Sequence, residues 1–163
     1  MAERSYRGLL WSLVAVGTIA DQVSKYGVFR WLYRHPELYD ESRLAGEYPI
    51  IPGVFKLLAQ FTGVHDPEGL WLTPLRTWSA DMLPKVNHGA LFGLGGEYQA
   101  VANSVFALVS VAAAVAITYW STRSLTARDP ALCAALGLIL AGTLGNLYDR
   151  VVFDGVRDFL YFH

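Results

Sequence analysis

The chain has 163 residues, of which 53% are hydrophobic and 17% are charged, so it is more apolar than an ordinary soluble domain. Its formal net charge is -1, which leaves no overall basic field to attract nucleic acid. The composition therefore favours a membrane protein whose specificity comes from local polar groups, and it argues against binding of nucleic acid.

The first predicted element is a membrane-spanning helix over residues 8–29. Thirteen uncharged residues from Gly8 to Ala20 are followed by Asp21 and Lys25, after which the apolar character resumes. A helix places residues four apart on one face, and charges inside a bilayer face a bundle interior or a polar cavity. We therefore predict that Asp21 and Lys25 point inward as a pair. The alternative is a cleaved signal peptide, because two arginines precede the short apolar core.

Residues 30–97 form the next predicted region, a connection on the outer side of the membrane. It is too long for a simple loop, and its proline, glycine and aromatic content predicts short strands and an interfacial element. Tyr48, Trp71 and Trp78 are expected at the level of the lipid headgroups, where amphipathic aromatic rings are favoured. We expect this region to form a small β-containing cradle.

Two further spans are predicted in the second half of the chain. Residues 100–120 run for twenty-one positions without a charge, which at a rise of about 1.5 Å per residue is enough to cross a hydrocarbon core of about 30 Å. Residues 131–148 form an eighteen-residue run after Pro130, a residue suited to the start of a helix. No internal repeat or linker is visible. Residues 1–163 are thus predicted to form one polytopic domain, an all-α integral membrane helical bundle with the outer cradle, acting as a monomer.

Basic residues in the short flanks predict the orientation. Arg4 and Arg7 precede the first span, and Arg123 and Arg128 lie between the second and the third. By the positive-inside rule both flanks are cytoplasmic, which places the cradle on the other side. Polar residues then gather near the outer face: Asp21, Lys25, Asn146, Asp149 and Arg150. Such a convergence is typical of a membrane active site, because each group alone would carry an uncompensated desolvation penalty.

The outer end of the third span carries a dense polar motif. Asn146, Asp149 and Arg150 are spaced so that a helix brings them together. Gly142 and Gly145 are small enough to let a neighbouring helix approach closely. The alternative interpretation of the motif is a salt-bridged helix end without chemistry.

Asp158 and Asn87 are the other candidates for chemistry. Asp158 lies in an apolar context, and burial there would raise its pKa and make it a candidate acid or base. The alternative is an interfacial aspartate paired with Arg157 or Arg150. Asn87, two residues before Gly89, has an amide that both donates and accepts hydrogen bonds. It could cap a helix or hold a substrate backbone.

The remaining reactive residue types point to little chemistry. Cys133 has no second cysteine for a disulfide or a thiolate metal site, so we interpret it as a small buried residue. The four histidines show no metal-ligand spacing, and the sequence predicts neither a metal nor a cofactor. Ser24 and Lys25 suggest a Ser–Lys hydrolase, but adjacent residues on a helix point about 100° apart, which argues against it.

Four motifs occur in a fixed order along the chain. They are residues 21–25 (DQVSK), 87–93 (NHGALFG), 142–150 (GTLGNLYDR) and 155–159 (GVRDF). Together they resemble the motifs of the lipoprotein signal peptidases, also called signal peptidase II, and residues 51–55 (IPGVF) are similar to the outer strand of that family. The resemblance covers nearly the whole chain. It implies an aspartic endopeptidase of the bacterial inner membrane that cleaves lipid-modified precursors before their diacylglyceryl-cysteine, near the outer face.

The resemblance also implies roles for particular residues. Asp158 corresponds to the first of the family's two catalytic aspartates. The positions that shape the pocket and hold the substrate correspond to Asp21, Lys25, Asn87, Gly89, Asn146 and Arg150. Asp149 matches the family's D-R position and is therefore structural. The implied partners are lipid-modified precursor proteins and membrane lipids.

Two departures from the family pattern lead to further expectations. Residues 58–84 look like an insertion between the outer strand and the Asn87 motif. The F-N-x-A-D motif with the second aspartate, and a fourth span, are expected beyond His163. The chain as given is therefore expected to be close to inactive, since loss of a general acid or base costs about 10²- to 10⁴-fold in rate. The rival interpretations are an inactive protein that binds lipid-modified peptides and a small proton-coupled transporter, although the duplicated halves typical of transporters are not visible.

Overall fold

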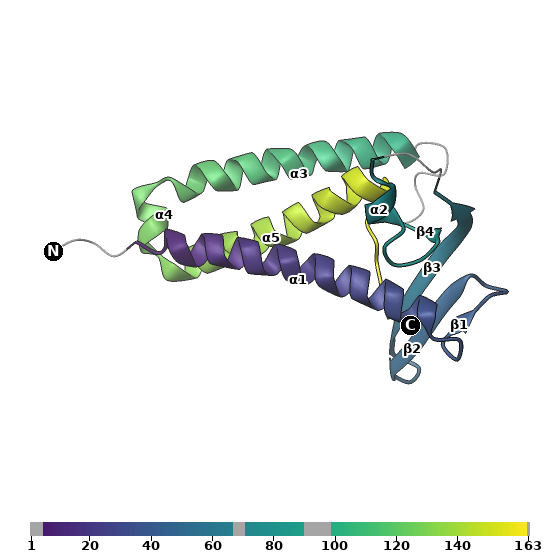
Figure 1. Ribbon diagram of the computed structural model, residues 1–163. Helices are drawn as coiled ribbons and strands as arrows, with labels where there is room; N and C mark the ends of the chain where they lie inside the picture. Colours follow the sequence, from purple (N-terminus) through teal and green to yellow (C-terminus); the bar gives the residue numbers. More distant parts are fainter. Residues whose placement is uncertain (1–4, 67–70, 90–98, 163) are drawn as a thin grey trace.

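The computed structural model describes residues 5–66, 71–89 and 99–162. The elements, in chain order, are α1 (Arg7–Arg34), β1 (Tyr39–Asp40), β2 (Ala45–Ile51), β3 (Phe55–His65), α2 (Thr73–Arg76), β4 (Met82–Pro84), α3 (Gln99–Ser121), α4 (Ser124–Arg128), α5 (Pro130–Phe153) and β5 (Leu160–Phe162). Helices α1, α3 and α5 run side by side, with α5 contacting both of the others, and the strands gather at one end (Figure 1). Arg4 and residues 90–93 of the NHGALFG motif lie outside the described residues.

Within the described residues, two helices are long and apolar enough to cross a membrane. They are Val101–Ser121, within α3, and Pro130–Phe153, which is α5, with mean hydropathies of 2.1 and 1.7. These helices agree with the spans predicted at 100–120 and 131–148, except that α5 continues beyond the predicted end. Helix α5 continues through Asp149 and Arg150 because both side chains have polar contacts. Asp149 forms ion pairs with Lys25 and Arg157, and Arg150 donates a hydrogen bond to Asn103.

Helix α1 is the longest of the three but the least apolar. It has 28 residues, and its hydrophobic run is interrupted by Asp21, Gln22 and Lys25. Its last turns carry Phe29 and Leu32, which are 1% and 0% exposed and pack against the strands. Because α1 forms part of the core at both ends, the fold argues against a cleaved signal peptide.

The helices pack through a small apolar cluster at the end far from the sheet. Leu10 and Val14 of α1 contact Cys133, Leu136 and Leu140 of α5. Cys133 is 1% exposed, which confirms its predicted burial. Helix α5 begins as predicted at Pro130, and the Asp129 side chain caps it by accepting hydrogen bonds from the backbone N–H groups of Ala131 and Leu132 at 2.9 and 3.0 Å.

Glycines on α5 allow α1 to approach closely, but only one of the two predicted positions does so. A Cβ atom at Gly145 would collide with the Asp21 carboxylate. At Gly142 the prediction is wrong: a Cβ atom there would meet no described atom within 4 Å, because this residue faces outward. The second close approach is at Gly137, where a Cβ atom would lie 2.8 Å from the Leu10 carbonyl oxygen.

The strands form one antiparallel sheet at the end of α1. Its order is β1-β2-β3-β4, and β5 also pairs with β3. The β2–β3 turn runs from Ile51 to Val54, with a 3.0 Å hydrogen bond between its ends and Gly53 at a φ of 76°. Proline at the second position and glycine at the third fit a type II turn. Strand β5 leads the chain back from α5 to the sheet and so fixes the segment that carries Asp158.

The proposed insertion at residues 58–84 is not a separate body. Its first part belongs to β3, the strand that pairs with β2, β4 and β5, and Ala59 and Phe61 are buried in the core there. Strand pairing therefore joins this part of the segment to the rest of the sheet. Within the described residues, the remainder forms α2, β4 and their connections.

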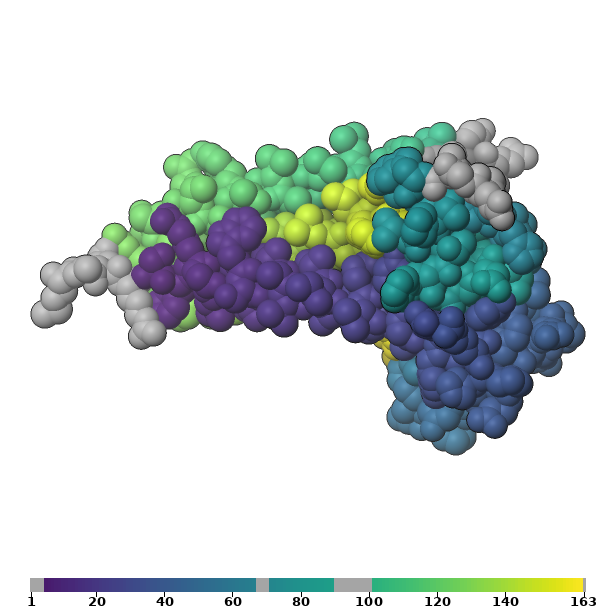
Figure 2. All heavy atoms as spheres, in the orientation of Figure 1, coloured from purple at the N-terminus to yellow at the C-terminus, as the bar shows by residue number. Residues whose placement is uncertain are grey.

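The helical part of the molecule is narrow and the sheet end is broader (Figure 2). Large apolar side chains are exposed on the outer faces of the helices, such as Ile19 at 63%, Leu108 at 70% and Ile139 at 56%. Only 11% of the apolar window in α3 is buried in the protein. The charged side chains of Lys25 and Asp149, by contrast, point inward and are buried. This distribution is typical of helices that face lipid.

Candidate active site

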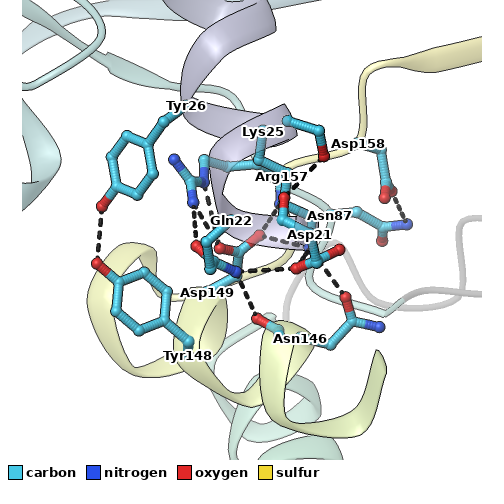
Figure 3. A network of polar contacts seen from close by, with 12 residues as sticks. Asp21, Gln22, Lys25, Tyr26, Asn87, Asn146, Tyr148, Asp149, Arg157 and Asp158 are labelled. Carbon is cyan, nitrogen blue, oxygen red and sulfur yellow. Dashed lines mark hydrogen bonds and ion pairs between the residues drawn. The ribbon is translucent and has the colours of Figure 1, made fainter. Parts of the chain in front are cut away.

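A buried carboxylate is at the centre of the polar network between α1 and α5. Asp149 is 0% exposed. One of its oxygens lies 3.2 Å from Lys25 Nζ and accepts a 3.0 Å hydrogen bond from the backbone N–H of Arg157. The other accepts hydrogen bonds from the Arg157 guanidinium at 2.8 and 3.3 Å (Figure 3). Asp149 is thus held between two cations.

The α1 pair points into the bundle, as the i, i+4 spacing predicts. Lys25 is 5% exposed, and its Nζ lies 2.9 Å from Asp21 Oδ2. The same ammonium donates a 3.1 Å hydrogen bond to the Asn146 side chain on α5. The Gln22 amide donates to Asp21 at 2.9 Å and to the Gly145 carbonyl at 3.0 Å. The three donors of Lys25 are therefore shared among acceptors on both helices.

Arg157 is the site residue that the sequence analysis did not identify. It is 1% exposed, and its guanidinium lies 4.1 Å from the ring centre of Tyr26 and 3.9 Å from that of Phe153. It also donates a 2.8 Å hydrogen bond to the Gln22 side chain. The network thus balances two carboxylates, Asp21 and Asp149, with two cations, Lys25 and Arg157.

Asp158 has no contact with this network among the described interactions, although it lines a pocket together with Asp21 and Lys25. Its side chain is exposed, although the residues on either side of it in the sequence are mostly apolar. Successive side chains of an extended segment point to opposite sides, so Arg157 turns inward to Asp149 while Asp158 turns outward. The suggested pairing of Asp158 with Arg157 is therefore not found among the described contacts. The GVRDF motif itself gives no signal of this, because Val156 and Arg157 are adjacent and both buried while Asp158 is exposed.

Asn87 holds the exposed carboxylate of Asp158. The Asn87 Nδ2 donates a 3.0 Å hydrogen bond to Asp158 Oδ2, and its Oδ1 accepts one of 2.8 Å from the backbone N–H of Gly89. Two backbone hydrogen bonds, 2.8 and 2.9 Å long, join Asn87 to Val156. Gly89 has a φ of 88°, which a side chain would strain. The helix-capping alternative is not supported, because this amide contacts Gly89 and Asp158.

Asp158 lies where two pockets meet. A pocket of about 330 Å³ on the helix side is lined by Asp21, Lys25, Asn146, Arg157 and Asp158, among others. A second pocket, of about 480 Å³, lies against the sheet and shares Asp158 and the residues that follow it with the first. The sheet-side pocket includes Asn87. The structure thus places Asp158 between Asn87, which lines the sheet-side pocket, and Asp21, Lys25 and Asn146, which line the helix-side pocket.

Arg150 lies on another side of α5. Its guanidinium donates a 3.1 Å hydrogen bond to the side chain of Asn103 on α3, and it lies 5.0 Å from the ring centre of Phe106. Asn103, which is 6% exposed, also donates a 2.6 Å hydrogen bond to Asp154. Arg150 lines a different pocket from Asp21 and Lys25. The three residues of the motif therefore do not all face the same helix. Asn146 and Asp149 face α1, whereas Arg150 faces α3.

Other arrangements of catalytic groups find no support in the geometry. The Ser24 hydroxyl donates a 2.8 Å hydrogen bond to the Asp21 carbonyl on its own helix, so it is not directed at Lys25. Within residues 5–66, 71–89 and 99–162, no three His, Cys, Asp or Glu side chains are gathered in a way that would hold a metal ion. The carboxylates, amides and ammonium group around Asp158 are instead suited to hydrogen bonding and proton transfer.

The chain is similar to several proteins that are named lipoprotein signal peptidase. The protein from Symbiobacterium thermophilum is 32% identical over 152 residues, which are 93% of this chain and 73% of that protein. The protein from Pseudomonas syringae pv. tomato is 40% identical over 47% of this chain and 44% of its own length. The protein from Rhodopirellula baltica is 44% identical over 46% of this chain and 37% of its own length. The chain thus matches less than half of the length of the last two relatives.

A solved structure and a family model extend the comparison to the whole chain. The structure is a bacterial membrane enzyme determined by the in meso method. It matches 100% of this chain and 75% of its own chain, with a TM-score of 0.63 and 20% identity, which shows a shared fold. The family model Peptidase_A8, signal peptidase (SPase) II, matches residues 13–163 and so includes every site residue described above. By this match the chain belongs to the signal peptidase II family.

Proposed function

We propose that Asp158 is one of the catalytic carboxyl groups of an aspartic endopeptidase that removes signal peptides from diacylglyceryl-modified precursors, with cleavage before the modified cysteine. The observation that carries the proposal is the exposed Asp158 carboxylate, which a hydrogen bond from Asn87 holds in a depression beside a buried charge network. Family membership supports the substrate class and the aspartic mechanism. A carboxylate so placed keeps lone pairs free for a water molecule or a substrate proton.

The chemistry assigned to Asp158 is general acid–base catalysis. In an aspartic peptidase two carboxyl groups share one proton, because like charges a few ångströms apart do not both ionise easily. One carboxylate takes a proton from water while the other carboxylic acid polarises the scissile carbonyl. Asp21 shares the helix-side pocket with Asp158, but Lys25 and Gln22 hold its carboxylate. We therefore assign Asp21 to the pocket wall and assign the second catalytic carboxyl to no described residue.

The buried network has a positioning role in this proposal. Arg157 donates hydrogen bonds to Asp149 from both its backbone N–H and its guanidinium. Because Arg157 directly precedes Asp158, these bonds fix the backbone from which the catalytic carboxyl projects. Reactive groups need support of this kind, since a displacement of about 1 Å can cost about 10²-fold in rate.

The proposed membrane placement has α1, α3 and α5 as spans of the bacterial cytoplasmic membrane, in a monomer. The end with α4 is cytoplasmic, and the sheet and Asp158 lie at the outer face. The Arg7 side chain supports this orientation: it donates hydrogen bonds of 3.1 and 2.6 Å to the carbonyls of Ser121 and Thr122, beside Arg123. Arg7 and Arg123 therefore lie together in the short flanks at the α4 end, and the positive-inside rule assigns such flanks to the cytoplasmic side.

Processing of a lipid-modified precursor by the full-length protein tests the proposal. The Asp158→Asn variant keeps the shape of the side chain but loses its acid–base function, so the rate should fall by about 10²- to 10⁴-fold. Asp81→Asn is the matched control, because Asp81 is also an exposed aspartate on the sheet side and lies outside both Asp158 pockets. A wild-type rate in Asp158→Asn would remove Asp158 from the mechanism.

The same assay addresses the rival interpretations. Family membership does not favour a transporter or an inactive peptide-binding protein. If the wild-type full-length protein retained the lipid-modified precursor without cutting it, the binding-protein interpretation would replace the peptidase.

A further inference from the structure

A groove distinct from the Asp158 pockets lies between α1 and the short helix α2. Most of its lining is apolar: Val23 and Gly27 from α1, and Pro74, Leu75 and Trp78 from α2 and the residues after it. Its volume is about 410 Å³. Val23, which lines the groove, is 65% exposed, and Ile19, one turn earlier on α1, is 63% exposed.

Side-chain hydrogen bonds attach α2 to the bundle on both sides of this groove. The Arg76 guanidinium donates to the Val152 carbonyl at the end of α5, at 2.6 Å, and to the buried side chain of Asp66, at 3.1 Å. The Ser79 hydroxyl donates a 3.1 Å hydrogen bond to the Tyr26 carbonyl on α1. In Figure 1, α2 accordingly lies beside the sheet-side end of α5. The groove is therefore a fixed feature of the fold.

Two arginines lie on α1 at the sheet side of the groove. The Arg30 guanidinium is 5.2 Å from the ring centre of Trp78, which lines the groove. Arg34 follows one helical turn later and is exposed. Within the described ranges neither arginine forms an ion pair. A guanidinium stacked on an indole ring keeps its N–H edge free, and that edge matches the oxygens of a phosphate.

We propose that the groove binds one anionic glycerophospholipid from the outer leaflet. The acyl chain lies along Val23, Gly27 and Leu75, and the phosphate lies at Arg30 and Arg34. Three observations favour this occupant. The groove is mostly apolar, Arg30 and Arg34 lie at its sheet-side end without an ion pair among the described residues, and Trp78 contacts both the groove and Arg30. Aromatic rings and basic side chains are favoured at the level of lipid headgroups. The site rests on the proposed placement of α1 in the membrane, and it does not depend on the peptidase chemistry.

Lipid retention tests this site. Full-length protein in mild detergent is mixed with equal amounts of phosphatidylglycerol and phosphatidylcholine that carry the same acyl chains, and native mass spectrometry counts the bound lipids. A Cβ atom at Gly27 meets no described atom within 4 Å, so Gly27→Leu extends into the groove without disturbing the packing. Phosphatidylglycerol retention should fall by about tenfold or more in this variant. Arg30→Gln should remove the preference for phosphatidylglycerol over phosphatidylcholine.

Gly8→Leu is the matched control. Gly8 lies on the same helix, and a Cβ atom there also meets no described atom within 4 Å, but it is at the other end of α1. This variant should retain phosphatidylglycerol like the wild type. Equal retention by Gly27→Leu and wild type would overturn the proposal, and so would equal retention of the two lipids by the wild type. Precursor cleavage is measured on the same samples, so failure of the lipid site and failure of the peptidase proposal can be told apart.

Discussion

Asp149 and Asp158 lie nine positions apart in the chain and occupy opposite surroundings. Asp149 is 0% exposed, and its two oxygens contact Lys25 and both the side chain and the backbone of Arg157. Asp158 is exposed, and within the described residues its hydrogen-bond donor is Asn87. One carboxylate is enclosed by cations, and the other faces open pockets.

This difference indicates which carboxylate is suited to chemistry. A buried carboxylate whose oxygens are held by Lys25 and Arg157 cannot reach a substrate. It stabilises the fold because its loss would leave the buried Arg157 without its ion-pair partner and Lys25 with Asp21 alone. A carboxylate with one amide donor can still accept a proton from water. Arg157 connects the two, since it pairs with Asp149 and directly precedes Asp158 in the chain.

The largest expected effect is on stability, from removal of the buried carboxylate. Asp149→Ala leaves Lys25 and Arg157 without their shared counter-charge, and the free energy of unfolding should fall by about 3 to 5 kcal/mol. Denaturant unfolding of the full-length protein in detergent micelles measures it. Asp158→Asn serves as the control, because an exposed side chain should change stability by less than about 0.5 kcal/mol. Equal losses of unfolding free energy in the two variants would show that Asp149 does not stabilise the fold more than the exposed Asp158.

The second prediction concerns the residue that connects the two aspartates. Arg157→Lys keeps the charge but loses the two-point contact with Asp149 and the planar stacking on Tyr26 and Phe153. Displacement of Asp158 should lower kcat for precursor cleavage by about 10²-fold. A positioning role predicts that KM changes much less than kcat. If KM rose and kcat stayed the same, Arg157 would act in substrate binding instead.

A smaller effect is expected at the amide that holds the exposed carboxylate. Asn87→Ala removes the hydrogen bond to Asp158 and the turn contact with Gly89. A hydrogen bond to a charged group contributes about 1.5 to 3 kcal/mol, so the cleavage rate should fall by about tenfold or more. Asn87→Gln keeps the amide but lengthens the side chain, and partial recovery of the rate would separate loss of the hydrogen bond from local unfolding.

The smallest effect concerns a third aspartate, Asp40, on the surface of the sheet. The side-chain hydrogen bond from Ser42 lowers the pKa of Asp40 from its ordinary value of 3.8. A lowered pKa means that the contribution to stability is present above the unfolded-state pKa and is lost as the pH falls through the folded-state pKa. In Ser42→Ala the pKa of Asp40 should move back toward 3.8. An NMR titration of the Asp40 carboxyl measures the shift, and an unchanged pKa would contradict the assignment.

Local sequence patterns predicted much of the helical architecture. Long uncharged runs predicted α3 and α5, Asp129-Pro130 predicted the start of α5, and the four-residue spacing predicted the inward pair of Asp21 and Lys25. These features depend on contacts within one helix or on the length of one run. They can therefore be derived before the rest of the fold is known.

The surroundings of Asp158 were decided only by tertiary structure. Its exposure, the inward turn of Arg157 and the turn of Arg150 toward α3 all depend on where β5 pairs with β3 and on how α5 packs between α1 and α3. The strand pairing joins Leu57 to Leu160, which are distant in sequence. Sequence alone thus determined which residues carry charge and where helices form. Long-range pairing determined which charges are buried together, because burial depends on neighbours that no local pattern specifies.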